Sequence, residues 1–451
     1  MNWSWSTSWE LEGRFWEPGD TEHRFYGRLR HTALDGPTFH FVDSTLNTGP
    51  IQGPAGPIEI LLGETLGGIP LTVLGFYPSR WAAHGLGSGN TVDGFADSVI
   101  AGAWLATLTE LEVSAVSVKV HGLLETLTGG TAEGGPLNPT ADEHGCDRMT
   151  VELSDGVGLV LQTGESRSVS RRREHSEVTA GAHLSLKPPL PFAELERKYL
   201  QPLCDLVLFA TRRPSYVESL AIKLISDSTE SFHVVRRPFP QPDARSERDV
   251  YALALNLGRV HSPTAVIKRW FELSDEVGPV WQLLFSTLGS STGLLENRLL
   301  NLVAFVEGYH RALHDEPPLT DKEDRSAQKA VKAALRSEDV HVRKVYREAV
   351  AYANSQTQRD RLDFLTRRCL LVLDLWDLDC DAFCEQVSHT RNWLIHWGKP
   401  GRSTLGQGSG MYMLFARLEV IVYANLMLDV GLTREEVAQE IGSGWRLERL
   451  P

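Results

Sequence analysis

The side chains best suited to chemistry in this sequence lie at residues 388–398. Arg391 and His396 stand five residues apart there, and Asn392 lies beside the arginine. A guanidinium donates two parallel hydrogen bonds to a phosphate and never loses its charge. An imidazole takes and gives a proton near neutral pH. A phosphate clamp beside a proton shuttle is enough to cleave RNA without a metal ion, and the motif predicts this chemistry.

The Arg-x-x-x-x-His spacing is weak support when it is taken alone. The chain has 35 Arg and 15 His in 451 residues, so about one match is expected by chance. A second match, Arg336 to His341, lies in a charged stretch and has no chemical context. Without further context, Arg391 and His396 would be interpreted as a helix-end capping pair, because a histidine cation favours the negative end of the helix dipole.

The residues around the motif resemble HEPN domains, an all-helical ribonuclease superfamily of toxins and defence systems. Residues 390–396 are similar to the Arg-Asn-aromatic-x-x-His core of these domains, and residues 295–311 resemble their first long helix. Glu307 stands where the family often keeps an acidic residue that faces the Arg/His pair. Leu394 departs from the Thr or Ser that often lies two residues before the family histidine.

The pairing of these two segments resembles the ApeA-like HEPN family. Residues 13–16 and 25–29 are in turn similar to the N-terminal domain of ApeA antiphage proteins. The resemblance implies an abortive-infection endoribonuclease that is metal-independent, needs no cofactor and forms a homodimer through its HEPN domain. Its RNA substrate is expected to be a transfer RNA.

The resemblance also implies a role for each motif residue. His396 would act as general base or acid, and Arg391 would stabilise the charge on the phosphorane. Asn392 would orient the histidine or a phosphate oxygen, and Glu307 would hold Arg391 or tune His396 electrostatically. On an ideal helix Arg391 and His396 lie about 140° apart. They can converge on one phosphate only if the helix end distorts near Gly398 or if two subunits combine their motifs, as HEPN families generally do.

Composition predicts a cytoplasmic protein with no membrane segment. No apolar run approaches the ~18 residues that a span needs, and the first residues lack the basic region of a secretory signal. Five cysteines at irregular spacings do not form a disulfide framework. The net charge of −13 argues against sequence-independent binding to nucleic acid. Residues 1–284 account for −11 of it and residues 285–451 for −2.

The pattern along the chain predicts an α+β protein of two domains. Residues 1–284 alternate β-type runs with Gly/Pro turns, which favours a mostly antiparallel, β-sandwich-like domain with flanking helices at 193–211 and 263–288. Residues 285–451 show helical periodicity and are expected to form the all-α HEPN bundle. Its helices are predicted to begin near 290 and to continue at 326–355, 358–376, 380–397, 410–430 and 433–441.

Two other kinds of function remain open. The HEPN module could be catalytically silent and serve as a dimerisation or nucleotide-binding scaffold. A metal-dependent nuclease or phosphatase would need clustered acids, and the one candidate run is Asp374, Asp377, Asp379 and Asp381, which is interpreted as a solvated turn at a helix break. Cys380 and Cys384 are interpreted as one face of a helix, because no further Cys or His completes a tetrahedral metal site.

The two domains are expected to divide their labour. A nuclease that attacks host RNA must be restrained until infection. An acidic surface suits a protein partner or an autoinhibitory contact better than RNA. Residues 1–284 are therefore expected to sense a phage-derived signal, a protein, and to hold the helical domain inactive.

Overall fold

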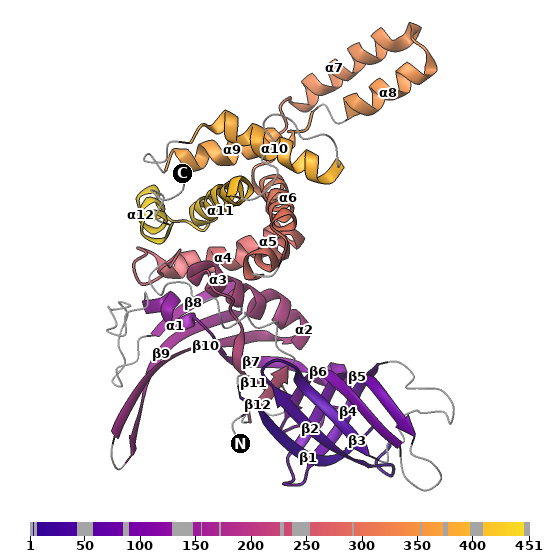
Figure 1. Ribbon diagram of the computed structural model, residues 1–451, viewed down its shortest axis with the longest axis vertical. Helices are drawn as coiled ribbons and strands as arrows, with labels where there is room; N and C mark the ends of the chain where they lie inside the picture. Colours follow the sequence, from indigo (N-terminus) through magenta and orange to yellow (C-terminus); the bar gives the residue numbers. More distant parts are fainter. Residues whose placement is uncertain are drawn as a thin grey trace. The chain divides into compact units, whose positions relative to one another are not determined.

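The computed structural model divides the chain into two compact units, Met1–Phe271 and Glu272–Pro451 (Figure 1). It describes residues 3, 7–42, 57–83, 90–128, 148–154, 156–170, 173–225, 230–236, 253–290, 293–351, 354–372, 378–396 and 409–445. The predicted α+β class, with an antiparallel β domain followed by an all-helical domain, is confirmed. The units divide earlier than position 284, where helix α5 (Pro279–Gly289) runs without a break.

Six antiparallel strands of the first unit close into a barrel. Their order is β3-β2-β1-β4-β5-β6, and β3 also pairs with β6 (Figure 1). The strands are β1 (Trp9–Trp16), β2 (Phe25–Thr32), β3 (Gly36–Val42), β4 (Ile58–Thr65), β5 (Pro70–Ala83) and β6 (Asn90–Ala101). The sheet thus closes on itself on one side, where the sequence pattern had favoured a sandwich-like arrangement.

Aromatic rings fill the barrel. Phe15, Phe39, Phe41 and Phe76 are buried, and their ring centroids lie 5.1–5.7 Å apart in successive pairs. Gly27 makes this packing possible, because a Cβ atom there would lie 2.3 Å from a ring carbon of Phe41. Rings of this size contribute much of the apolar area that stabilises a small barrel.

The sheet continues from β6 in the order β12-β11-β7-β10-β9-β8. The added strands are β7 (Glu112–Val120), β8 (Arg148–Ser154), β9 (Val157–Ser170), β10 (Arg173–Pro191), β11 (Val217–Leu224) and β12 (Phe232–Arg236). Val116, Val118 and Val120 of β7 are buried at every second position. This alternation gives the strand one buried face.

Helices accompany this part of the sheet. They are η1 (Leu108–Glu110), α1 (Leu123–Thr128), α2 (Phe192–Leu195), the π-helical turn η2 (Glu196–Leu200), α3 (Gln201–Thr211) and α4 (Pro263–Val277). The indole nitrogen of Trp270 in α4 donates a hydrogen bond to the carbonyl oxygen of Pro202 at 2.8 Å. Because Trp270 is fully buried, this bond satisfies its polar atom and fixes α4 beside α3.

Two predicted helices are interrupted. The helix expected at 263–288 is divided into α4 and α5 by Gly278, whose φ of 65° is left-handed, and by Pro279. The helix expected at 326–355 is divided into α7 (Asp321–Ala334), η3 (Leu335–Ser337) and α8 (Val340–Ala351). Glu338 between them has an extended backbone, so the helical hydrogen-bond ladder stops there.

The other helices of the second unit follow the sequence pattern closely. They are α6 (Leu295–Leu313), α9 (Gln358–Leu370), α10 (Cys380–His396), α11 (Ser409–Asp429) and α12 (Arg434–Trp445). Thr433 and Glu436 cap the start of α12, since the Glu436 amide donates to the Thr433 hydroxyl at 3.2 Å and the Glu436 carboxylate accepts from the Thr433 amide at 2.8 Å. Helix α9 ends at Leu370, earlier than the predicted position 376, and residues 373–377 lie outside the described residues.

Helix α11 is the one described helix that is long and apolar enough to cross a membrane, by length and composition alone. However, 72% of its most apolar stretch is buried inside the protein. The helix contacts α6, α9, α10 and α12, and these contacts account for its apolar surface (Figure 1).

Candidate active site

Helix α10 carries the predicted motif at its C-terminal end. The carboxylate of Asp379 accepts a hydrogen bond from the Ala382 amide at 3.0 Å, which satisfies a free N–H group of the first turn. One face of the helix is buried and consists of Phe383, Cys384, Val387 and Thr390. Because α9 packs against α10, this face fixes where the last two turns of the helix present their side chains.

The three motif residues occupy those last two turns. Helix α10 stays α-helical through His396, and Gly398 lies outside the described residues. Arg391 follows the buried Val387 by four residues and is half-buried. Asn392 and His396 are both exposed and are four residues apart, so they share one face of the helix. The backbone therefore places Arg391 and His396 on different faces.

A contact with Asn392 partly offsets the angle between Arg391 and His396 around the helix. The Nη1 atom of Arg391 donates a hydrogen bond to Oδ1 of Asn392 at 3.0 Å. Positions 392 and 396 are only about 40° apart around an ideal helix. The guanidinium of Arg391 is consequently turned from the packed side of the helix toward the exposed face that carries His396.

Carboxylates do not neutralise these two groups within the described part of the chain. Arg391 and His396 form no ion pair there, whereas the neighbouring His389 lies 3.7 Å from a carboxylate oxygen of Glu385. An unpaired guanidinium keeps its hydrogen-bond donors for an external anion, and a phosphate is the anion whose geometry it matches best.

Glu307 lies in a different ionic group from the one that the resemblance implied. Its carboxylate is 3.2 Å from a guanidinium nitrogen of Arg311 and 3.8 Å from one of Arg361. Arg361 is almost fully buried, and Asp315 accepts a second bond from it at 3.0 Å. Among the described residues, the structure thus brings Glu307 to Arg361 and not to Arg391.

Sequence reasoning missed a polar network that joins α6, α9 and α11. Both oxygens of Asp429 accept hydrogen bonds from Arg368, at 2.6 and 2.9 Å. Tyr309 also donates to Asp429, and His314 lies 3.3 Å from it. Burial raises the pKa of Asp429, but the hydrogen bonds from His314, Arg368 and Tyr309 outweigh this and hold the pKa well below its usual range. In the sequence, the acid Asp429 at the end of the largely apolar stretch 409–429 was the signal from which this network could have been predicted.

His310 lies next to this network and is fully buried. Neither ring nitrogen has a hydrogen-bond partner among the described residues. Its ring packs edge-on against Phe364, with centroids 4.9 Å apart. Burial lowers the pKa of His310 to about 4, and the positive charges of His314 and Arg361 act in the same direction. The imidazole is therefore neutral at physiological pH.

The second Arg-x-x-x-x-His match has no comparable setting. Arg336 lies in η3 and His341 in α8, and the extended Glu338 separates the two elements. The amide of His341 donates to the Asp339 carboxylate at 2.7 Å, a contact typical of a helix start. The two side chains are exposed and belong to no single helix, so this pair is suited to serve as a control.

Two acidic residues of the 374–381 run have structural roles. Asp379 caps α10, and Asp381 forms an ion pair with Arg367 at 2.8 Å. Asp374 and Asp377 lie outside the described residues. The interpretation of a turn at a helix break agrees with these two contacts.

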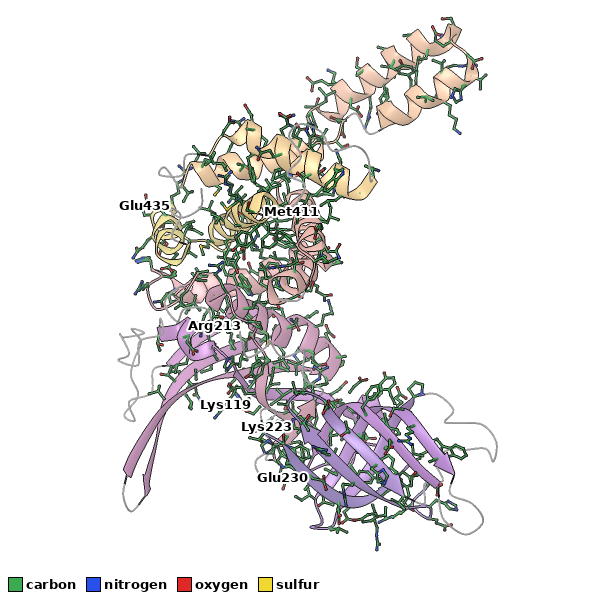
Figure 2. The ribbon with its side chains drawn as sticks, in the orientation of Figure 1. Lys119, Arg213, Lys223, Glu230, Met411 and Glu435 are labelled. Atoms are coloured by element: carbon green, nitrogen blue, oxygen red, sulfur yellow. The ribbon has the colours of Figure 1, made fainter. Side chains whose placement is uncertain are left out.

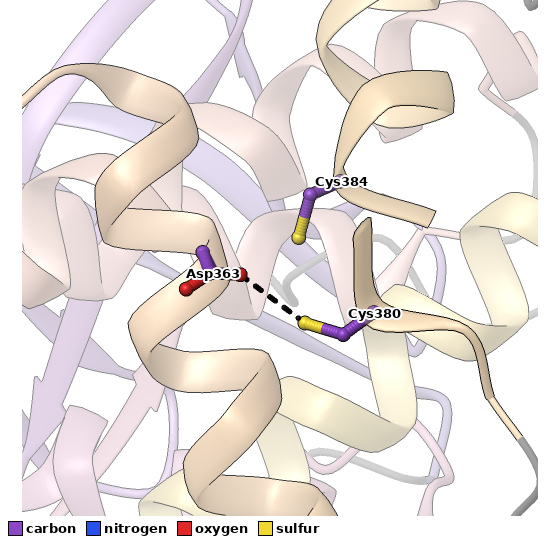
Figure 3. Close-up of side chains that lie close together, drawn as sticks. All are labelled: Asp363, Cys380 and Cys384. Carbon is purple, nitrogen blue, oxygen red and sulfur yellow. Dashed lines mark hydrogen bonds between the residues drawn. The ribbon is translucent and has the colours of Figure 1, made fainter. Parts of the chain in front are cut away.

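The helix face that holds Cys380 and Cys384 has an acidic neighbour. Asp363 of α9 and the two thiols place their potential ligand atoms within 4.8 Å of one another (Figure 3). The sequence offered no third ligand, because Asp363 reaches the pair only through the packing of α9 on α10. The Cys380 thiol donates to Asp363 at 3.3 Å, and Arg367 donates to the same carboxylate at 2.8 and 3.0 Å. Burial raises the pKa of both thiols, so protonated thiols that pack two helices describe this cluster best.

The two units correspond to two known kinds of domain. The family model "ApeA N-terminal domain 1" matches residues 10–257, and the family model "Apea-like HEPN" matches residues 300–436. No curated protein and no solved structure matches the chain. The first family model covers more than half of the chain, so the protein belongs to the ApeA family, with an ApeA-like HEPN domain after it. These domains mark it as an antiphage defence protein with a nuclease-type domain.

Proposed function

We propose that the protein is a metal-independent endoribonuclease whose catalytic groups are Arg391 and His396 of α10. The observation that carries the proposal is the bond from Arg391 to Asn392. It turns a guanidinium that has no ion pair among the described residues toward the exposed face of His396. The Apea-like HEPN match includes all three residues. A histidine that transfers protons and an arginine that binds phosphate are sufficient for transesterification of RNA.

The reaction uses the 2′-hydroxyl of the RNA as its nucleophile. His396 removes the hydroxyl proton while the 2′-oxygen bonds to the adjacent phosphorus. Arg391 stabilises the extra negative charge of the phosphorane. The bond from phosphorus to the 5′-oxygen then breaks, and a protonated imidazole returns a proton to that oxygen. The products are a 2′,3′-cyclic phosphate and a 5′-hydroxyl.

A homodimer would bring the groups of two motifs into one cleft. Arg391 and His396 start from helix positions about 140° apart, and the Asn392 contact offsets only part of this angle. A second α10 across a twofold axis would supply the missing group. We take transfer RNA as the substrate, a phage-derived protein as the trigger and the cytoplasm as the compartment.

The test is cleavage of transfer RNA by the purified full-length protein in the presence of EDTA. We expect cleavage to persist with EDTA, to leave 2′,3′-cyclic phosphate ends, and to fall by about 10²-fold or more in Arg391→Ala and in His396→Ala. The matched control is the double variant Arg336→Ala/His341→Ala, which removes the same two residue types at the same spacing. Activity that disappears on chelation would reject the mechanism, and variants with wild-type cleavage would favour a silent HEPN scaffold.

A further inference from the structure

A cavity of about 400 Å³ lies in the first unit, far along the sequence from α10. Strands β7 to β12, the extension of the sheet beyond the barrel, form its floor, and Trp3 forms part of its wall. Ligand pockets commonly have volumes of roughly 300–1,000 Å³. The cavity is therefore large enough for a small organic ligand.

Strand register explains why the floor is hollow. One row across the sheet pairs His183 with Ser117, Ser117 with Ala221, and Ala221 with His233. Gly181 lies two residues before His183, on the same face of β10. Small side chains in the middle of the sheet leave open space, and longer side chains border it.

The longer side chains that border the cavity are basic. Lys119 of β7 and Arg148 of β8 line it together with the two histidines, and no Asp or Glu is among the described lining residues. Lys223 of β11 (labelled in Figure 2) is on the same face of the sheet, opposite Ala115, and lies outside the cavity lining. Burial lowers the pKa of His183, and the charges of Lys223 and Arg148 lower it further, so both cations act on the floor of the cavity.

Among the described residues, no carboxylate forms an ion pair with Lys119, Arg148 or Lys223. Glu152 occupies the same face of β8 as Arg148 but lies outside the cavity lining. Lys119 and Arg148 line the cavity with their side chains exposed, so an anion that binds between them is attracted by both charges.

Trp3 adds an aromatic side chain to the wall of this basic site. The residue is 7% exposed, and its ring packs edge-on against Trp9, with centroids 5.1 Å apart. A fixed indole beside cations suits a ligand that has both an aromatic ring and an anionic group. A peptide is a poorer fit, because the floor is the face of a sheet whose backbone groups are already paired between strands.

We propose that this cavity binds a nucleoside phosphate. Arg148 and Lys119 hold the phosphate, and Trp3 packs against the base. Apart from Trp3, the site lies within the residues that match the ApeA N-terminal domain, and it uses none of the residues of α10. It gives this domain a small-molecule ligand, separate from the RNA that the HEPN domain is proposed to cleave.

The test is isothermal titration calorimetry on the full-length protein with His396→Ala, so that no RNA probe is cleaved. Each of the four ribonucleoside diphosphates is titrated in EDTA, beside inorganic phosphate, adenosine and a ten-nucleotide single-stranded RNA. We expect at least one diphosphate to bind, and Arg148→Ala and Lys119→Ala each to weaken it about 10-fold or more. Trp3→Leu should weaken the diphosphate but not inorganic phosphate. The matched control is Lys187→Ala, an exposed cation of β10 outside the cavity lining.

Several results would overturn the proposal. They are no binding of any diphosphate to the folded protein, binding that both cavity variants leave unchanged, and an equal loss in Lys187→Ala. Tighter binding of the RNA than of every diphosphate, abolished by the same variants, would assign the cavity to an RNA strand instead. Circular dichroism checks that each variant is folded, and the two cation variants test the site independently of each other.

Discussion

At the scale of single residues, Asn392 determines where the charge of Arg391 is presented. Arg391 leaves α10 beside a buried face, and its guanidinium reaches the exposed face through a bond of 3.0 Å to Asn392. The resemblance implies that Asn392 orients the histidine or a phosphate oxygen. From its contact with the arginine, we propose that Asn392 also positions Arg391.

Replacing Asn392 by alanine should lower RNA cleavage by about 10- to 100-fold, because a small displacement of a catalytic group has effects of this size. The loss should appear in kcat more than in KM, since Arg391 still attracts the substrate. The measurement is steady-state cleavage of transfer RNA by Asn392→Ala beside Arg391→Ala. An asparagine variant as active as the wild type would exclude the positioning role.

His310 makes the stability of the helical unit depend on pH. Its pKa is about 4 in the folded protein and 6.5 in the unfolded chain. The unfolded chain therefore binds more protons between these values, and stability falls as the pH decreases from 6.5 toward 4, then levels off. The charged groups that act on it are His314 and Arg361, which lower the pKa, and Asp315, which raises it. The loss could reach about 3 kcal/mol.

The corresponding variant is His310→Leu, which removes the titrating group. We expect hydrogen exchange of residues 300–313 to accelerate between pH 7.5 and pH 5 in the wild type, after correction for the intrinsic rate, and to change much less in His310→Leu. The control is His341→Leu, at an exposed histidine of α8. Equal pH dependence in the wild type and His310→Leu would show that another group is responsible.

At the scale of helices, periodicity predicted some boundaries well and others poorly. Helix α10 was expected at 380–397 and is described through His396, because its buried face recurs regularly and Asp379 begins it. The prediction of a single helix at 263–288 was wrong, because the apolar periodicity continues across the break at Gly278 and hides it. Periodicity of buried positions alone therefore does not locate a helix break that Gly and Pro impose.

The polar network could not be predicted for a different reason. Tyr309, Arg368 and Asp429 come from three helices, and each is unremarkable within its own segment. Their contacts depend on how α6, α9 and α11 pack, which local patterns do not specify. The same is true of Asp363 and the two cysteines of α10. The motif on α10 was identifiable because all of its residues lie on one short stretch.

Asp429→Asn should destabilise the helical unit strongly. Asp429 is 12% exposed and Arg368 26% exposed, so the substitution leaves a largely buried guanidinium without its counter-charge. Breaking such a pair costs about 3 kcal/mol. The matched control is Asp363→Asn, which removes the acid of the more exposed pair with Arg367 and should cost less than about 1 kcal/mol. Chemical denaturation at pH 7 measures both, and equal effects would contradict the assignment.

At the scale of the whole molecule, the prediction to test is that the first unit keeps the nuclease of the helical unit inactive. The acidic first unit was expected to hold the helical domain inactive until a trigger binds. A test needs the helical unit alone, and the structure indicates where to begin it. Helix α5 packs closely on α6, since a Cβ atom at Gly308 would lie 2.6 Å from Val280. A fragment that begins at 285 would cut α5 and lose the buried Trp281. A start at Glu272 would cut α4, so the fragment should begin at Gly278, between α4 and α5.

We predict that residues 278–451 are more toxic in cells than the full-length protein at equal abundance. The reason is that the fragment lacks the first unit, which we propose restrains the nuclease, while Arg391 and His396 remain on α10. His396→Ala should abolish the toxicity of the fragment, which separates RNA cleavage from the effects of an unstable protein. Growth after induction measures toxicity, and light scattering on the purified fragment measures folding and assembly. A folded, dimeric fragment that leaves growth unaffected would mean that the first unit helps to build the RNA site instead of restraining it.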